Sequence, residues 1–250
     1  KIISLDVGAQ GGFNSDNFFP SKYNHFFENI LVEPIKSEAD KLKDAKFTIN
    51  KGLWSKKEIK KLYILDNRLG SSSMYMPNEK AFDLHDIKRK DFENYKVTRS
   101  IEIECDTISS QLSELKINSL DYLKIDTQGA ELEILKGIGK YRPLLIKLEA
   151  HFFSMYKDVP NWHELVNYLH NMNYVLIDTK GIGRHNVRIP VEADMIFIPN
   201  FNILAGKELI KDNQEKFISL MLIFGQIKIL QVILNMLHIN NEEIDKLEDY

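Results

Sequence analysis

Apolar and polar positions alternate in two different patterns along the chain. Short runs rich in Ile, Leu and Val predict β-strands at 2–7, 29–34, 121–126, 144–149, 174–178 and 194–199. Between some of these runs, apolar residues recur at steps of three and four, which predicts amphipathic helices over 129–138 and 161–173. Strands that alternate with helices favour an α/β fold with a doubly wound, mostly parallel sheet, in which ligands bind beyond the carboxyl ends of the strands.

The stretch from about Lys46 to Asp106 breaks this alternation. Its β-like runs are separated by polar, charged segments rather than by helical patterns. We expect a third core strand followed by an inserted β and loop region, about 55–106, that overhangs the site. This divides the chain into a main domain over 1–205 and a C-terminal helical segment over 206–250.

The segment from Phe217 to Leu237 is rich in Ile, Leu and Met. Its polar positions form one stripe along a helix, which a membrane-spanning helix would not need: Lys228, Gln231, Asn235 and His238. The pattern therefore favours a buried or dimer-forming amphipathic helix over a membrane-surface anchor. We expect a homodimer contact or a lid over the domain's own core, and no membrane span.

Composition favours a small-molecule partner. The formal net charge of -3 provides no global attraction to nucleic acid or to an anionic membrane. Cys105 is the single cysteine, so the chain cannot form an internal disulfide, and we expect a reducing, cytoplasmic compartment.

A glycine-rich loop follows the first predicted strand, in the sequence SLDVGAQGGF over residues 4–13. The strand ends in Asp6, and Gly8, Gly11 and Gly12 allow tight turns and a close approach of the backbone to a ligand. Their spacing matches neither the dinucleotide fingerprint nor a P-loop, and the acidic residue repels a pyrophosphate. A ligand with a nucleoside and a cationic group, but no phosphate, fits this loop better.

The second predicted strand ends in Glu33 and Pro34, about twenty residues past the loop. A carboxylate at this position can accept hydrogen bonds from both ribose hydroxyls, as in nucleoside-binding α/β folds. A surface glutamate with no ligand is the alternative. Together, the loop and Glu33 predict an adenosyl ligand.

The block KIDTQGAE contains charged residues at the end of a central strand. Lys124 and Asp126 share one face of that strand, and a buried lysine needs a partner, for which Asp126 or Glu149 is suited. The alternative to a catalytic role is an ion pair that shapes the sheet edge. Glu131, in the first turn of the next helix, either responds to the helix dipole or orients the acceptor or the amino group of the cofactor.

His151 follows the next strand, close to the expected mouth of the site. A histidine that titrates near neutrality can remove a hydroxyl proton. The alternative is a histidine packed against Phe152 and Phe153.

Three segments, LDVGAQGG, VEP and DYLKIDTQGAELEILKG, resemble the FkbM family of S-adenosylmethionine-dependent methyltransferases. The resemblance covers most of residues 2–199 and implies the seven-stranded, Rossmann-like class I methyltransferase fold with S-adenosylmethionine as cofactor. Gln10 occupies a position that is glycine in the general class I loop. The FkbM pattern usually has Asn or a similar residue there, so Gln10 favours this subfamily.

The resemblance and the residue patterns together give candidate roles. The candidates for binding the cofactor are Asp6, Gly8, Ala9, Gln10, Gly12, Glu33, Pro34, Leu53 and Gln128. The candidates for catalysis are Asp126, His151 and Lys124. The candidates for binding the substrate are Glu131, Glu149, Asn67, Ser72 and Ser73. Methyl transfer requires no metal and the sequence has no decisive metal-ligand motif, although Asp126, Glu131 and Glu149 could hold a divalent ion.

The leading hypothesis is O-methylation of a hydroxyl on a sugar, a glycan or another small metabolite, as FkbM-like enzymes typically catalyse. The alternatives are an NAD(P)-dependent oxidoreductase on the same type of sheet and a non-catalytic S-adenosylmethionine-binding module. Acceptor specificity is expected in Asn67–Tyr95 and in the segment after His151.

Overall fold

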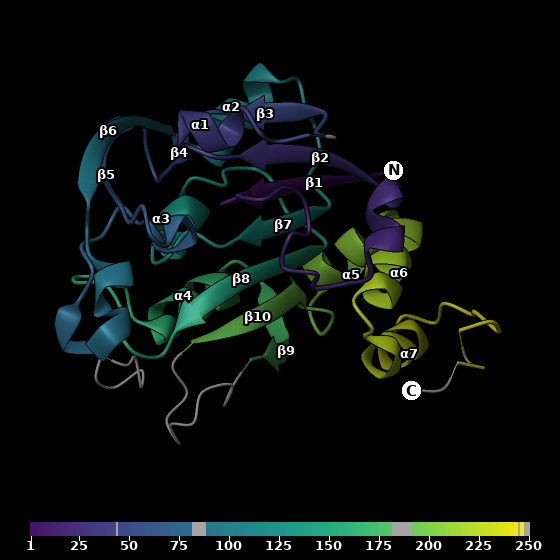
Figure 1. The fold of residues 1–250 in the computed structure, drawn as a ribbon. Helices are drawn as coiled ribbons and strands as arrows, with labels where there is room; N and C mark the ends of the chain where they lie inside the picture. The colour runs from purple at the N-terminus through teal and green to yellow at the C-terminus, as the bar shows by residue number, and fades with distance from the viewer. Residues whose placement is uncertain (44, 82–88, 182–191, 245, 248–250) are drawn as a thin grey trace.

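A seven-stranded sheet forms the centre of the molecule (Figure 1). The computed structural model describes residues 1–43, 45–81, 89–181, 192–244, 246 and 247. The strand order is β3-β2-β1-β7-β8-β10-β9, with β10 antiparallel to both of its neighbours and the pairs among β3, β2, β1, β7 and β8 parallel. The strands are β1 (Ile2–Val7), β2 (Phe27–Val32), β3 (Phe47–Ile49), β7 (Tyr122–Ile125), β8 (Leu145–His151), β9 (Tyr174–Lys180) and β10 (Glu192–Pro199). The predicted mostly parallel α/β sheet is confirmed, and its strands differ from the predicted ranges only at their ends.

A second, three-stranded sheet follows β3 in the chain. It has the order β4-β6-β5 and lies on the side of the central sheet to which the parallel strands point (Figure 1). Its elements are β4 (Gly52–Leu53), β5 (Glu58–Ile64), the 3-10 helices η2 (Leu69–Ser71), η3 (Glu79–Ala81) and η4 (Arg89–Tyr95), and β6 (Arg99–Asp106). Residues 82–88 of the predicted insertion lie outside the described residues.

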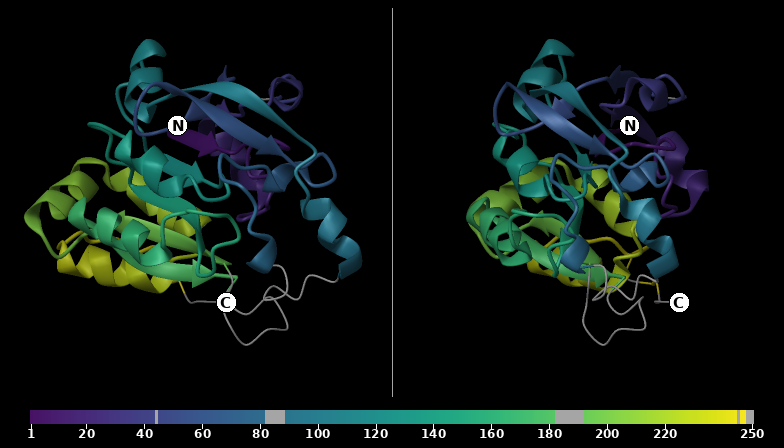
Figure 2. Two further views of the ribbon diagram at one scale, coloured as in Figure 1. Left: turned by 90° about the vertical axis from the view of Figure 1, so that its left-hand side faces the viewer. Right: turned by 60° about the vertical axis from the view of Figure 1, so that its left-hand side comes forward.

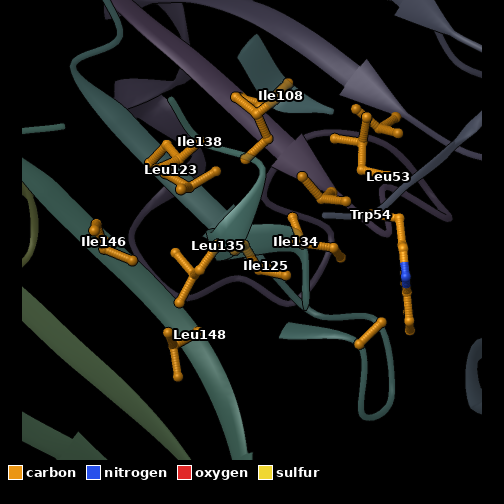
Figure 3. Packing of buried hydrophobic residues seen from close by; sticks show 14 of the residues in the cluster. Leu53, Trp54, Ile108, Leu123, Ile125, Ile134, Leu135, Ile138, Ile146 and Leu148 are labelled. Carbon is orange, nitrogen blue, oxygen red and sulfur yellow. The ribbon is translucent and has the colours of Figure 1, made fainter. Parts of the chain in front are cut away.

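One face of the central sheet packs against helices that follow the strands in the chain. These helices are α2 (Ile108–Glu114), α3 (Glu131–Lys136) and α4 (Trp162–Asn171), and a short helix, α1 (Lys36–Ala39), follows β2. Thr107 caps α2 by accepting a hydrogen bond from the backbone N–H of Ser110, which explains where that helix begins. Ile134 and Leu135 of α3 pack with Leu123 and Ile146 of the strands in the larger hydrophobic core (Figure 3).

The opposite face has a smaller core at the beginnings of the parallel strands, where Ile2, Tyr122 and Leu145 are buried. It is covered by three helices close to the end of the chain, α5 (Leu204–Asp212), α6 (Gln214–Ile223) and α7 (Ile227–Met236) (Figures 1 and 2). The fully described connection from β1 to β2 contains one 3-10 helix, η1 (Ser21–Phe26), and no α-helix. The C-terminal helices therefore cover the part of this face that a helix between β1 and β2 would otherwise cover.

Aromatic rings join the β1–β2 connection to the C-terminal helices. Phe19 stacks on Phe27 with ring centroids 5.3 Å apart, and it lies 5.2 Å from the ring of Phe224. Phe224 also meets the ring of Tyr122 edge-on at 5.2 Å. Such ring pairs add stabilisation beyond the burial of apolar area.

The prediction of one helix over 217–237 is wrong. The chain turns at Gly225, where φ is +70°, and α6 and α7 are separate helices. Glycine adopts this left-handed conformation without steric cost and commonly follows the end of a helix. The sequence pattern missed the break because the apolar periodicity continues through it.

The two faces of α7 differ in exposure. Leu230, Ile233 and Leu234 are buried in the smaller core, whereas Lys228 and Asn235 of the predicted polar stripe are exposed. The helix covers the chain's own core, which was one of the two roles expected, and the homodimer stays a prediction. Across the described part of the chain, none of the helices has the length and apolar character needed to cross a membrane.

We predict that Leu234→Ala lowers the free energy of unfolding by about 2–5 kcal/mol, because it removes buried methyl groups and leaves a cavity. The matched control is Val232→Ala on the same helix, whose side chain is 50% exposed. This control should change stability by less than about 0.5 kcal/mol. Urea denaturation of both variants measures the difference, and equal losses would show that α7 does not pack on this core.

Candidate active site

A cavity lies beyond the carboxyl ends of β1, β2 and β7, and the inserted sheet forms part of its wall. The order of strands reverses at β1 and β7, since β2 and β7 flank β1 on opposite sides. Ligands of open α/β sheets bind at such a switch point. The cavity is lined by these predicted site residues: Gly8, Gln10, Glu33, Pro34, Leu53, Ser72, Lys124, Asp126 and Gln128.

Gly8 brings the glycine loop against the end of β7. Its φ is +84°, and a Cβ added there would lie 1.9 Å from the carbonyl oxygen of Asp126. The backbone N–H of Asp126 donates to the carbonyl oxygen of Val7 at 3.0 Å, which holds the two strand ends together. Glycine is thus required at position 8 for contact with the protein's own backbone, and the loop can also approach a ligand in the cavity.

Glu33 places a carboxylate in the cavity at the end of β2. Its side chain is buried, and Oε1 accepts a hydrogen bond from the backbone N–H of Ile35 at 2.8 Å. Burial raises the pKa of Glu33 to about 7, and the nearby Glu38 carboxylate adds to the rise. The ionisation of this carboxylate therefore changes across the neutral pH range.

A buried ion pair joins β1 to β7. Lys124 Nζ lies 3.1 Å from Asp6 Oδ1 and 4.0 Å from Asp126 Oδ2. Asp6 and Lys124 are direct neighbours in the parallel pairing of β1 with β7. The expected pairing of Lys124 with Asp126 is confirmed at the longer distance, whereas Asp6, the nearer partner, was not expected.

Both members of this pair are removed from water. Asp6 is 0% exposed and does not line the cavity, which differs from the direct cofactor contact expected of it. Burial raises the pKa of Asp6, and the Lys124 ammonium offsets only part of that rise. Burial alone would lower the pKa of Lys124, but the carboxylates of Asp6 and Asp126 raise it. Lys124 is consequently ionised at neutral pH.

A second buried lysine was missed in the sequence. Lys147 Nζ on β8 lies 2.6 Å from Asp16 Oδ2 and 3.0 Å from Asp194 Oδ1. Asp16 belongs to the β1–β2 connection and lines the cavity. The signal was present, since Lys147 interrupts an apolar strand as Lys124 does, but its partners are far away in sequence.

Gln128 lies between the cavity and the end of β8. Its Nε2 donates to Glu149 Oε2 at 2.7 Å, and its backbone oxygen accepts from the Ser73 hydroxyl at 2.7 Å. The Tyr156 hydroxyl lies 2.8 Å from Gln128 Oε1 and also from the carbonyl oxygen of Ser71, and it can donate to one of them at a time. Gln128 is thereby fixed between the inserted region and β8.

Comparison with protein families identifies the family of this chain. The family model of the methyltransferase FkbM domain matches residues 6–176, which is more than half of the chain and includes the end of β1, the inserted sheet and β7. The chain belongs to the FkbM methyltransferase family. Comparisons with curated proteins and with solved structures gave no match.

In this FkbM domain, Glu131 holds the turn between β7 and α3. Its Oε1 accepts hydrogen bonds from the backbone N–H groups of Thr127 and Gly129 and from the Thr127 hydroxyl. The carboxylate is buried and does not line the main cavity. The structure thus gives Glu131 a role within the protein, while its predicted contact with substrate stays a prediction.

Four other predicted residues of the FkbM domain do not line the cavity. Ala9 is fully buried, and Gly12 borders a separate hollow near the start of the chain. Asn67 is exposed without lining the cavity, whereas Ser73 is buried and bound to Gln128. Small and polar residues occur both at turn positions that line a cavity and at turn positions that only stabilise the turn. The sequence alone therefore could not distinguish the two kinds of position.

His151 and Glu149 line a smaller hollow beside the main cavity of the FkbM domain. The rings of His151 and Tyr156 meet edge-on with centroids 5.9 Å apart. Burial, together with the carboxylates around it, raises the pKa of Glu149 well above its ordinary value. The structure does not bring His151 to the cavity that Glu33 and Asp126 share.

We predict that Lys124→Met lowers the free energy of unfolding by about 3–5 kcal/mol at pH 7, because the buried Asp6 carboxylate loses its partner. The double variant Asp6→Leu with Lys124→Met removes both charges and should recover most of that loss. Urea denaturation of the wild type, the single variant and the double variant provides the comparison. A double variant that is no more stable than Lys124→Met would contradict the pairing.

Proposed function

We propose that this FkbM protein transfers a methyl group from S-adenosylmethionine to a hydroxyl oxygen of a sugar, a glycan or another small metabolite. The observation that carries the proposal is the Glu33 carboxylate in the cavity, at the end of the strand next to the glycine loop. A carboxylate at this position can accept hydrogen bonds from the hydroxyls of a ribose.

The charges around the cavity favour a cationic donor over a pyrophosphate. The carboxylates of Asp16, Glu33 and Asp126 line it. The two lysines that also line it are each paired with a carboxylate, Lys124 with Asp6 and Lys51 with Glu104. A dinucleotide site places the pyrophosphate at the N-terminus of the helix after the glycine loop, and the β1–β2 connection contains no α-helix. These two features support the methyl donor over the nicotinamide cofactor of the alternative hypothesis.

S-adenosylmethionine supplies an electrophilic methyl group on a positively charged sulfur. Glu33 would bind its ribose, Gly8 and Gln10 would border its methionine part, and Leu53 would provide an apolar contact. All four residues line the cavity, so the groups that the cavity presents fit S-adenosylmethionine. Holding donor and acceptor in line is the main contribution that the protein can make to such a displacement.

Asp126 is our candidate for the general base. It lines the cavity at the end of β7, and its side chain is 31% exposed, which leaves room for contact with an acceptor. Its carboxylate would accept the hydroxyl proton as the acceptor oxygen forms its bond to the methyl carbon and the carbon–sulfur bond breaks. The hydrogen bond at 3.4 Å from Gln128 Nε2 to Asp126 Oδ1 helps to orient the carboxylate.

We predict that Glu33→Gln weakens S-adenosylmethionine binding by roughly tenfold to a hundredfold, because hydrogen bonds to an ionised group contribute about 1.5–3 kcal/mol. With a pKa of about 7, the ionised fraction of Glu33 falls about tenfold from pH 8 to pH 6, and wild-type affinity should fall with it. Calorimetry at both pH values measures the two effects.

The matched control for Glu33 is Glu28→Gln, on the same strand but bound to Lys46 at the surface. This variant should keep the affinity and the pH dependence of the wild type, whereas Glu33→Gln should lose the pH dependence. Undiminished binding to Glu33→Gln, or no binding to the wild type at pH 8, would refute the proposed donor site.

We predict that Asp126→Asn lowers kcat by about 10²–10⁴-fold, because an amide cannot take the hydroxyl proton. Formation of S-adenosylhomocysteine, followed by mass spectrometry over a panel of sugars and sugar nucleotides, identifies an acceptor and gives the rate. Calorimetry should show that the variant still binds the donor. Full turnover by Asp126→Asn would exclude it as the base, and donor binding without turnover on any acceptor would favour a non-catalytic module.

A further inference from the structure

We propose that Glu149, His151 and Glu192 bind a divalent transition-metal ion at the ends of β8 and β10. The proposal concerns a site beside the main cavity and does not rest on the proposed methyl transfer. One histidine nitrogen and two carboxylates, each contributing one atom, lie within 4.8 Å of one another.

The sheet itself brings the three side chains together. Glu149 and His151 are two residues apart on β8, so they project from the same face. Glu192 on β10 is directly opposite His151 in the antiparallel pairing. His151 Nε2 lies 3.5 Å from Glu149 Oε2 and 3.8 Å from Glu192 Oε2. Metal–ligand distances of about 2.0–2.2 Å place neighbouring ligand atoms about 3–3.5 Å apart, so small side-chain adjustments suffice.

The unsatisfied nitrogen of His151 is a second, independent indication of a ligand. Its side chain is 4% exposed, and Nε2 has no hydrogen-bond partner within the described residues. That nitrogen faces the oxygens of Glu149 and Glu192. Buried polar atoms almost always have a partner, and a bound ion would provide one.

The surrounding charge also favours a cation. The carboxylates of Asp126, Glu131 and Asp194, like that of Glu192, lie close enough to Glu149 to interact with it electrostatically. The neighbouring Lys147 ammonium lies against Asp16 and Asp194. Carboxylates therefore outnumber the cations at this end of β8 in the described structure.

The chemistry of the donor set indicates the class of metal. Imidazole nitrogen suits Zn²⁺ and Fe²⁺, and carboxylate oxygen suits Mn²⁺, so a mixed set favours these ions over Ca²⁺ and Mg²⁺. Three protein ligands leave at least one coordination position open. Gln128 connects the site to the main cavity, because its Nε2 donates to Glu149 while its side chain lines the cavity.

The test uses the full chain after treatment with a chelator. Titration with MnCl₂, followed by electron paramagnetic resonance of the free ion, and calorimetry with ZnCl₂ should each show saturable binding of one ion per chain. His151→Gln and Glu192→Gln should each weaken the affinity at least tenfold. The control His170→Gln, at an exposed position near the end of α4, should bind as the wild type does.

Absence of saturable binding by the wild type, or equal binding by the wild type and Glu192→Gln, would overturn the proposal. The Glu192 side chain is 38% exposed, so Glu192→Gln should fold, which circular dichroism checks. This variant tests the proposal even if His151→Gln does not fold. Glu33→Gln should bind Mn²⁺ normally. A protein that binds Mn²⁺ but not S-adenosylmethionine would therefore disprove the proposed function and leave the metal site standing.

Discussion

The ion pair between Asp6 and Lys124 sets the geometry on which the cavity depends. It joins β1 and β7 at the switch point of the sheet, where the strand ends separate to make room for a ligand. Two charges in a protein interior are costly to desolvate, and losing one of them is worse than having neither. The loop after β1 and the turn after β7 are consequently held against each other. At their contact, the backbone of Gly8 packs directly on the backbone of Asp126.

The face of the sheet that contains this pair changes character along each strand. Near the strand beginnings it is apolar, with Ile2 and Tyr122 in the smaller core, and further along it contains Lys124 and Lys147 with their carboxylate partners. Helices α5 to α7 cover the apolar part. The charged part lies toward the cavity, so one surface both stabilises the fold and supplies polar groups to the site.

Local patterns in the sequence correctly predicted the core strands and one residue of the cavity. Runs rich in Ile, Leu and Val identified the core strands, and the position of Glu33 at the end of one run predicted its place in the cavity. Pairings between distant segments were not accessible in the same way. The partner of Lys124 depends on the register between β1 and β7, and that of Lys147 depends on the path of a loop without an α-helix. The break at Gly225 was missed because hydrophobic periodicity does not report the sign of φ.

The aromatic contact between Phe19 and Phe224 has a consequence for biosynthesis. During synthesis, the first strands leave the ribosome long before the helices that cover their second face. Phe19, Phe27 and Tyr122 therefore remain uncovered until most of the chain has been made, and exposed apolar surface of this kind makes folding intermediates prone to aggregation. The N-terminal part of the molecule can therefore complete its packing only after the C-terminal helices have been synthesised.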